Sequence, residues 1–208
     1  VWQTGYPPLL YPTHSLGPLL ELLDDRCVSA IGAGAAGEVA RRRGEFDAGV
    51  AILRTGKGTV IKLLLAFGIV REPMLHYFVL YGSNGTIETR REGTGFRGFR
   101  AFFADVPHLQ DMIDYPITDR HPAVSGVSGG HGTWEQVMIA AFVGALQRGE
   151  PAPIDVYRAA DFTVPGIVAH ASALKGGTPL DVPDLRTASE APVESGADPP
   201  AARRPQHE

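Results

Sequence analysis

Two strand-like runs lie so close together in this sequence that they can pair only as antiparallel neighbours. The runs cover residues 46–53 and 59–67, and the segment between them, Arg54-Thr55-Gly56-Lys57-Gly58, has five residues. Parallel strands need a crossover connection of roughly a dozen residues or more, usually a helix, so this connection allows only a hairpin.

A second hairpin is predicted directly after the first. The runs 75–81 and 86–90 flank Gly82-Ser83-Asn84-Gly85. An Asn-Gly pair is typical of a tight turn with positive φ angles. The stretch from residue 46 to residue 90 is therefore expected to fold back on itself twice.

A glycine-rich motif precedes the first hairpin. A short strand is predicted over 27–31, and Gly32-Ala33-Gly34-Ala35-Ala36-Gly37 then matches the G-x-G-x-x-G fingerprint of a dinucleotide site. That fingerprint works within a parallel strand-helix-strand unit, which the following hairpin does not allow. A flexible glycine-rich connector is the favoured interpretation, and no complete Rossmann domain is expected.

Three helices are predicted from capping residues and apolar spacing. Ser15 is expected to cap a short helix with Leu16 and Leu20 on its apolar side. Thr133-Trp134-Glu135-Gln136 fits a capping box and begins a helix that ends before Gly149. The buried face of this second helix is expected to hold Trp134, Val137, Met138, Ala141, Phe142, Ala145 and Leu146.

The third predicted helix is capped by Asp155. It is expected to be broken or restarted at Pro165 and to stop at Gly176-Gly177. Hairpins followed by helices, without alternation, predict an α+β fold: an open, mainly antiparallel sheet with helices packed on one face.

Composition narrows the protein class. The net charge is −4 and the basic residues are scattered, which argues against a nucleic-acid partner. The longest apolar run, from Thr59 to Val70, has 12 residues and includes Lys62, too short for the roughly 20 residues of a membrane span. Cys27 is the only cysteine, which fits a reducing compartment and a cytoplasmic location.

The expected domain organisation is one domain followed by a tail. Residues 187–208 contain four prolines and no leucine, isoleucine or aromatic residue, so they are predicted to be a disordered tail. Residues 1–186 are expected to form a single domain. Because the sequence begins with Val1 and not with methionine, we expect a fragment of a longer protein.

The densest polar cluster before a helix is Tyr11-Pro12-Thr13-His14. A histidine there can exchange a proton near neutral pH, while the alternative is that Thr13 and His14 only satisfy backbone groups at the helix start. His131, within Gly129-Gly130-His131-Gly132, lies where glycines permit close approach of a ligand, and the alternative there is a permissive loop. Lone histidines such as His76, His108, His121 and His170 are interpreted as surface or core residues.

Five segments in order resemble the C-terminal domain of Gfo/Idh/MocA oxidoreductases. They are Pro7–Ser15, Gly129–Gly132, Ile154–Tyr157, Pro165–His170 and Val182–Asp184. The likeness is greatest to the branch with a Tyr-Pro-Thr-His motif, which is similar to NAD-dependent glycosidases acting on α-N-acetylgalactosamine. Leu10 and Pro12 stand where other branches have the aspartate and glycine of an Asp-x-Gly-x-His motif.

The resemblance implies the substrate-binding half of an NAD(P)-dependent oxidoreductase for a sugar or polyol. NAD or NADP would be bound mainly by an N-terminal Rossmann domain absent from this chain, and the sheet would form a homo-oligomer interface. Tyr11 and His14 would be the catalytic residues, with His14 exchanging a proton with a sugar hydroxyl. The implied substrate-binding residues are Thr13, His131, Trp134 and Glu135.

Two alternatives remain open at this point. The same scaffold could support redox-assisted glycoside cleavage, in which NAD transiently oxidises the sugar. The chain could also be a non-catalytic binding or assembly module, because an exposed apolar sheet face needs a partner.

Overall fold

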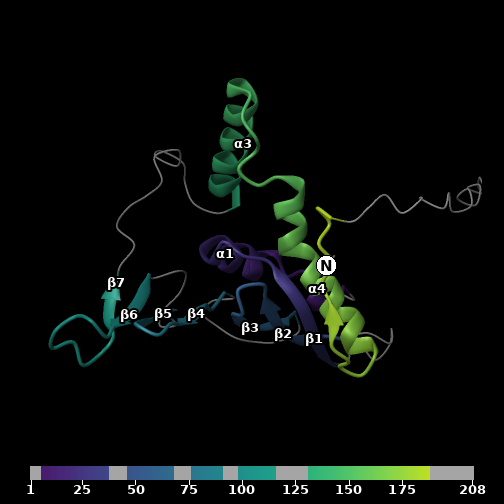
Figure 1. Cartoon of the computed structure of the whole chain (residues 1–208), viewed down its shortest axis with the longest axis horizontal. Helices are drawn as coiled ribbons and strands as arrows, with labels where there is room; N and C mark the ends of the chain where they lie inside the picture. The colour runs from purple at the N-terminus through teal and green to yellow at the C-terminus, as the bar shows by residue number, and fades with distance from the viewer. Residues whose placement is uncertain (1–5, 38–45, 68–75, 91–97, 116–130, 188–208) are drawn as a thin grey trace, which may run out of the picture.

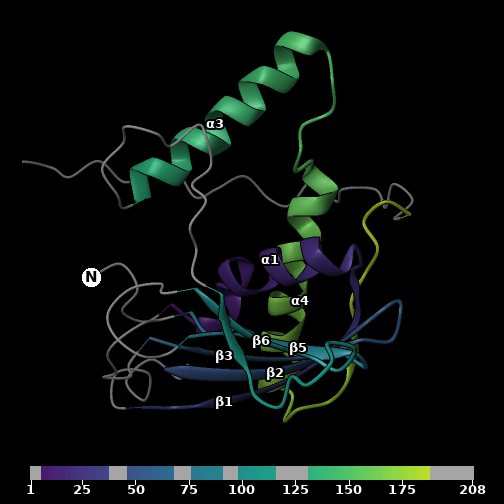
Figure 2. The ribbon, with the colours of Figure 1, turned by 90° about the vertical axis from the view of Figure 1, so that its left-hand side faces the viewer.

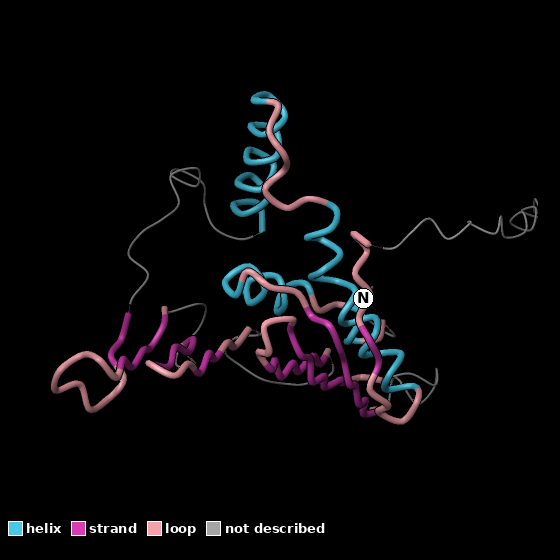
Figure 3. Tube along the Cα trace, in the orientation of Figure 1, coloured by secondary structure: helices cyan, strands magenta, loops and turns pink. Residues whose placement is uncertain are grey.

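The computed structural model describes residues 6–37, 46–67, 76–90, 98–115 and 131–187. They form two antiparallel sheets, three α-helices and one 3-10 helix (Figures 1 and 3). The helices are η1 (Pro8–Leu10), α1 (Thr13–Leu23), α3 (His131–Arg148) and α4 (Val156–Leu174). The strands are β1 (Cys27–Ala35), β2 (Ala48–Thr55), β3 (Val60–Ala66), β4 (Val79–Tyr81), β5 (Gly85–Thr89), β6 (Phe99–Phe103), β7 (Ile113–Tyr115) and β8 (Leu180–Asp181).

Both predicted hairpins are confirmed. β2 and β3 pair antiparallel from Ala48↔Ala66 to Arg54↔Val60, and Gly58 takes the positive φ of 93° that the turn requires. β4 and β5 also pair antiparallel. Their turn differs from the prediction, because neither Asn84 nor Gly85 has a positive φ: the Gly82 N–H donates to the Gly85 carbonyl over 2.8 Å, and β5 begins at Gly85.

The strands form two four-stranded sheets, in the orders β3-β2-β1-β8 and β4-β5-β6-β7. In Figure 1 they lie along the bottom, from β7 at the left to β1 at the right, with α1 and α4 on the upper side. Figure 2 shows the same two helices above the strands from another direction. The predicted α+β class, with antiparallel strands and helices on one face, is confirmed, although the strands divide into two sheets.

The glycine cluster is part of a strand, which corrects the predicted connector. β1 continues through Ala35 and pairs with β2 as far as Ala35↔Ala48. A side chain at Gly32 would collide with the Ala169 carbonyl of α4, and one at Gly34 would collide with the ring of Phe46. Small residues are needed here because a helix and an aromatic ring lie directly on the strand.

α4 covers this part of the sheet. The Asp155 carboxylate caps the helix by accepting from the Arg158 N–H over 2.7 Å, as predicted. Pro165 lies inside the helix without breaking it, contrary to the prediction. The helix ends before Gly176 and Gly177, whose φ angles of 73° and 85° explain why glycine is needed there.

The core lies between α4, α1 and the inner face of the first sheet. Its buried residues come from all three elements and from η1. They are Leu9, Leu16, Leu20, Cys27, Ala30, Ala51, Leu53, Ile61, Leu63, Phe162, Ala169 and Val182.

α3 does not match its predicted role. It begins at His131, so Thr133 is inside the first turn and the predicted capping box does not start the helix. Ala145 is buried, but Met138, Phe142 and Leu146 are more than half exposed. Among the described residues, α3 has no extensive packing against another helix or strand, and it projects away from the sheets (Figures 1 and 2).

Within the described part of the chain, no helix combines the length and the apolar character needed to cross a bilayer. Thr187 is the last described residue, so the predicted tail lies almost wholly outside the described residues. The boundary between residues 186 and 187 stays a prediction.

Candidate functional site

The Tyr11–His14 segment connects η1 to α1. Pro8 begins the 3-10 turn, and the Tyr11 N–H donates to the Pro8 carbonyl over 2.9 Å. Pro12 is the N-cap of α1, and its carbonyl accepts from the Leu16 N–H over 2.8 Å. The helix therefore begins at Thr13, and the predicted cap Ser15 lies inside the first turn.

Two glycines leave room for this segment to pack closely between β2 and α4. Leu9 is 1% exposed, and a Cβ at Gly49 of β2 would lie 2.5 Å from its Cγ. On the other side, a Cβ at Gly166 of α4 would collide with the Leu9 carbonyl and lie 2.5 Å from Cγ of Pro12. The segment is wedged between a strand and a helix, which fixes the direction in which Tyr11 leaves it.

Stacked rings form the centre of the site. The Tyr11 and His14 ring centroids are 4.8 Å apart with an interplanar angle of 26°. The His14 and His76 rings are 5.7 Å apart and nearly parallel, at 8°. The His76 ring stacks in turn on Phe78 at 6.5 Å and 23°. We call Tyr11, His14, His76 and Phe78 the ring row.

Two further rings hold Tyr11 edge-on. Tyr6 lies at 6.5 Å with an interplanar angle of 87°, and Phe67 lies at 6.0 Å with an angle of 65°. Such edge-to-face contacts fix the orientation of an aromatic ring. Tyr11 is half-buried, whereas His14 is exposed at the start of the helix, so the ring row presents an imidazole to a ligand on a fixed aromatic support.

The sequence predicts that His76 is an ordinary surface or core residue. The fold brings it into the candidate site, where its ring stacks on His14. It precedes β4, far from His14 in the sequence, and no spacing rule connects the two residues. Partial desolvation and the positive charge of His14 lower the pKa of His76 below its ordinary value. Only the position of the second hairpin beside the start of α1 could have revealed this contact.

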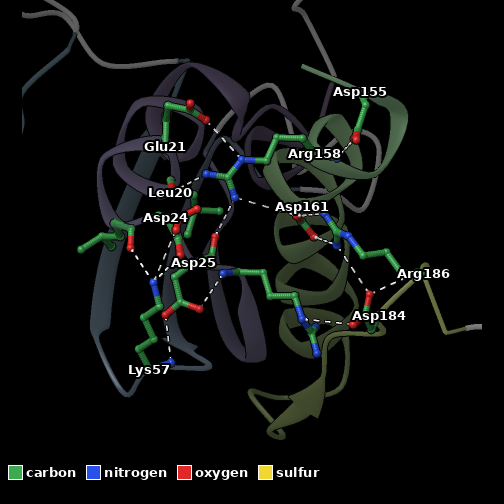
Figure 4. Close-up of polar contacts among 12 residues, drawn as sticks. Leu20, Glu21, Asp24, Asp25, Lys57, Asp155, Arg158, Asp161, Asp184 and Arg186 are labelled. Atoms are coloured by element: carbon green, nitrogen blue, oxygen red, sulfur yellow. Dashed lines mark hydrogen bonds and ion pairs between the residues drawn. The ribbon is translucent and has the colours of Figure 1, made fainter. Parts of the chain in front are cut away.

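The far end of α1 is fixed by cations (Figure 4). The Arg158 guanidinium of α4 donates to the carbonyls of Leu20, over 2.6 Å, and Asp25, over 3.0 Å. Lys57, from the β2–β3 turn, donates to the Asp24 carbonyl over 2.5 Å. Positive groups at the C-terminal end of a helix satisfy its last carbonyls and complement its dipole. These contacts fasten α1 to both α4 and the sheet.

The described residues do not test whether the other predicted site residues join the ring row. Thr13 is the first residue of α1 and is half-buried. Glu135 is exposed on α3, the helix that projects away from the sheets. The side chains of His131 and Trp134 lie outside the described residues. A common site for all six predicted residues therefore stays a prediction.

The described residues offer no obvious holder for a metal or for nucleotide phosphates. Within them, no three side chains of His, Cys, Asp or Glu gather at a point that could hold a metal ion. Gly32 and Gly34 of the dinucleotide-like motif face a helix and an aromatic ring, so no phosphate can approach their Cα atoms on that side. The chemistry available at the ring row is proton exchange and aromatic stacking.

Comparison with protein families decides the assignment of the chain. Residues 42–190 match the family described as "Glycosyl hydrolase 109, C-terminal domain". The chain belongs to this family. The predicted likeness to a Gfo/Idh/MocA-type C-terminal domain is confirmed with it. The matched region begins after Tyr11-Pro12-Thr13-His14, so the assignment to a branch with that motif stays a prediction.

Curated relatives of this glycosyl hydrolase 109 domain are about twice its length. A glycosyl hydrolase family 109 protein of Solibacter usitatus is 28% identical over 197 residues, which cover 85% of this chain and 45% of the relative. A protein of Shewanella oneidensis named alpha-N-acetylgalactosaminidase is 25% identical over 211 residues, which cover 88% of this chain and 46% of that one. The chain thus spans about half the length of these proteins.

Solved structures show the same fold. A levoglucosan dehydrogenase in complex with NADH and levoglucosan superposes with a TM-score of 0.66 at 16% identity, covering 83% of this chain and 49% of that one. An NAD binding oxidoreductase from Klebsiella pneumoniae superposes with a TM-score of 0.64 at 12% identity, covering 82% and 49%. At these identities the likeness concerns the fold alone.

Proposed function

We propose that this chain is the substrate-binding half of an NAD(P)-dependent enzyme that acts on a sugar or polyol. The observation that carries the proposal is the ring row, in which the exposed imidazole of His14 stacks with the rings of Tyr11 and His76. The family assignment and the sugar-related names of the relatives support a carbohydrate substrate.

In this proposal His14 exchanges a proton with a substrate hydroxyl. An imidazole is the side chain best suited to this near neutral pH, and the stack holds its ring in place. Tyr11 forms the wall beside it, and Thr13 contacts the substrate at the start of α1. A bound NAD or NADP would supply a hydride acceptor for the carbon whose hydroxyl loses the proton. His131, Trp134 and Glu135 stay proposed substrate contacts.

The dinucleotide is proposed to be held mainly by an N-terminal Rossmann domain outside this chain. The family description names a C-terminal domain, and the relatives are about twice as long. The packed glycines of β1 do not fit a phosphate cradle. The isolated chain is therefore expected to bind NAD or NADP weakly, and tight binding measured by calorimetry would contradict this expectation.

Between dehydrogenation and redox-assisted glycoside cleavage, the family assignment favours cleavage. The test uses the full-length protein with NAD and an aryl α-N-acetylgalactosaminide. Release of the aryl group without net accumulation of NADH supports cleavage, whereas accumulation of NADH with a free sugar or polyol supports a dehydrogenase. His14→Ala is expected to remove either activity.

A matched control is His108→Asn. His108 is exposed and has a φ of 66°, a conformation that asparagine tolerates better than alanine. This variant is expected to keep full activity. If His14→Ala also keeps full activity, the non-catalytic binding or assembly module is the better interpretation.

The sheet face turned away from α4 is the proposed homo-oligomer interface. Neighbouring strands place four exposed aliphatic side chains on it: Ile31 opposite Ile52, and Val50 opposite Leu64. We propose that a second copy of this chain binds to this face. Arg54 and Lys62 lie on the same face and border its apolar centre. An apolar centre with a polar rim is typical of protein interfaces. Ile52→Lys is expected to convert an oligomer to a monomer in sedimentation, with Arg54→Lys as the control.

The cytoplasmic location stays a prediction that depends on cysteine usage. Cys27 is a buried free thiol. Fractionation of the native cells would test it.

A further inference from the structure

We propose that His76 is a positioning residue for His14: its ring stacks on the His14 imidazole and holds that imidazole in the ring row. The stacking is a property of the chain itself, and its catalytic importance rests on the proposed function of His14. Neither the sequence motifs nor the family description assigns a role to His76.

The geometry supports positioning through ring stacking. His14 stacks with Tyr11 at a centroid distance of 4.8 Å and with His76 at 5.7 Å. The two partners come from different parts of the fold, namely the turn before α1 and the segment before β4. A ring that stacks on two independent elements cannot rotate about χ2 without losing a contact.

The same geometry excludes metal chelation by this pair. The nitrogen lone pairs of an imidazole lie in the ring plane, and the planes of His14 and His76 are only 8° from parallel. The lone pairs of the two rings therefore do not converge on one ion. Stacking, and not shared ligation, is the interaction that this arrangement offers.

The charge state of His76 favours the stack. Partial desolvation and the charge of His14 lower the pKa of His76 below its ordinary value, so the His76 ring is uncharged near neutral pH. The next side chain, Tyr77, donates its hydroxyl to Glu88 of β5 over 2.9 Å. Phe78, which also stacks on His76, carries no charge. An uncharged His76 ring can lie on the His14 imidazole without charge repulsion.

The test separates the ring from its charge. His76→Phe keeps a stacked ring and removes the titration, whereas His76→Ala removes both. The imidazole signals of His14 are followed by NMR from pH 5 to pH 8 in the whole 208-residue chain, and His108→Asn serves as the control. Circular dichroism confirms that each variant keeps its fold.

At pH 8 the ring-current shift of the His14 signals is expected to remain in His76→Phe and to be lost in His76→Ala. The control His108→Asn should show the same shift as the wild-type chain. A His14 shift that is the same in all four proteins would overturn the proposal. Because no activity is measured, this result does not depend on the proposed reaction.

In the full-length enzyme, positioning makes a further prediction. His76→Ala should lower kcat by about 10- to 100-fold with little change in KM, as expected when a reacting group is misplaced. His76→Phe should retain most of kcat and alter the pH dependence on the acid side. Equal losses in both variants, or a change in KM alone, would contradict positioning through the ring. If His14→Ala is fully active while the ring-current result holds, the proposed function fails and the positioning of the His14 ring by His76 stands.

Discussion

α3 and α4 have similar apolar spacing but very different surroundings. Phe162 of α4 is 7% exposed and Ala169 is fully buried, whereas Phe142 and Leu146 of α3 are 51% and 63% exposed. α4 packs on β1 and α1, but α3 has no comparable partner among the described residues. A helical period shows that one side of a helix is apolar, but it does not show what covers that side.

The difference lies in how closely the backbone can approach its neighbour. α4 has Gly166 against the Leu9 carbonyl and Ala169 against Gly32 of β1, so its backbone rests directly on the site segment and the sheet. α3 has a glycine too, but a Cβ at Gly144 would meet only the end of the flexible Arg148 side chain, at 3.0 Å. Small residues on one face of a helix therefore indicate close backbone packing more reliably than large apolar residues do.

The largest expected contrast comes from removing one phenylalanine in each helix. Phe162→Ala empties a core position beside Gly17 and Arg158 and should lower the free energy of unfolding by about 3–5 kcal/mol. Phe142→Ala removes a ring that is half exposed and should cost less than about 1 kcal/mol. Urea unfolding measures both, and equal losses would show that α3 is buried as α4 is.

Adding a methyl group at a glycine tests close approach. Gly166→Ala should destabilise the chain by about 1–3 kcal/mol, because Leu9 and Pro12 have to move. Gly144→Ala should leave the free energy of unfolding unchanged or raise it by up to about 1 kcal/mol, the gain in helix propensity. Gly17→Ala is a second control, because its Cβ would make an ordinary contact with Phe162 at 3.6 Å. If Gly166→Ala has the unfolding free energy of the wild-type chain, Gly166 does not contact Leu9 and Pro12 as closely as described.

The helix starts give a smaller contrast. Asp155→Ala removes the cap of α4 and should cost about 1 kcal/mol of unfolding free energy. Thr133→Ala changes a residue inside the first turn of α3 and should be nearly neutral. A loss at Thr133 as large as the loss at Asp155 would mean that α3 starts later than His131.

The smallest stability effect concerns the thiol beneath α4. Burial raises the pKa of Cys27 to about 12, so the protonated thiol contributes stability that is complete below about pH 9 and is lost as the pH rises towards 12. The loss should be under about 1 kcal/mol at pH 9.5 and absent in Cys27→Ala.

Thiol labelling checks the same contrast directly. At pH 8 a thiol reagent should leave Cys27 unmodified in the folded chain and modify it in urea. In a Cys27→Ala background, Ala141→Cys on the exposed side of α3 should react at once. Rapid labelling of Cys27 without urea would mean that the layer beneath α4 is open.

Local rules predicted the hairpins well and the glycine cluster poorly. A short connection leaves one possible pairing, so residues 46–67 could be assigned from the sequence. The glycines of β1 serve a contact with α4, which is more than a hundred residues later, and a local motif cannot express that. For the same reason Pro165 was expected to break a helix that its packing in fact maintains.

The candidate site was predictable only where its residues are neighbours in the sequence. Tyr11 and His14 belong to one motif, and the structure stacks them. His76 and Phe67 join them through the arrangement of the hairpins, for which the sequence gives no spacing signal. The predicted residues on α3 lie on a helix for which the described residues show no extensive packing partner.

The wedge at Leu9 also has a consequence for biosynthesis. Gly49 and Gly166, which contact Leu9, are synthesised well after it, and Gly166 is synthesised only with α4. Contacts between such distant positions close a long loop, which slows folding. A nascent chain that ends before α4 already contains all four residues of the ring row. It still lacks Gly166, whose contact with Leu9 and Pro12 holds the segment that carries Tyr11.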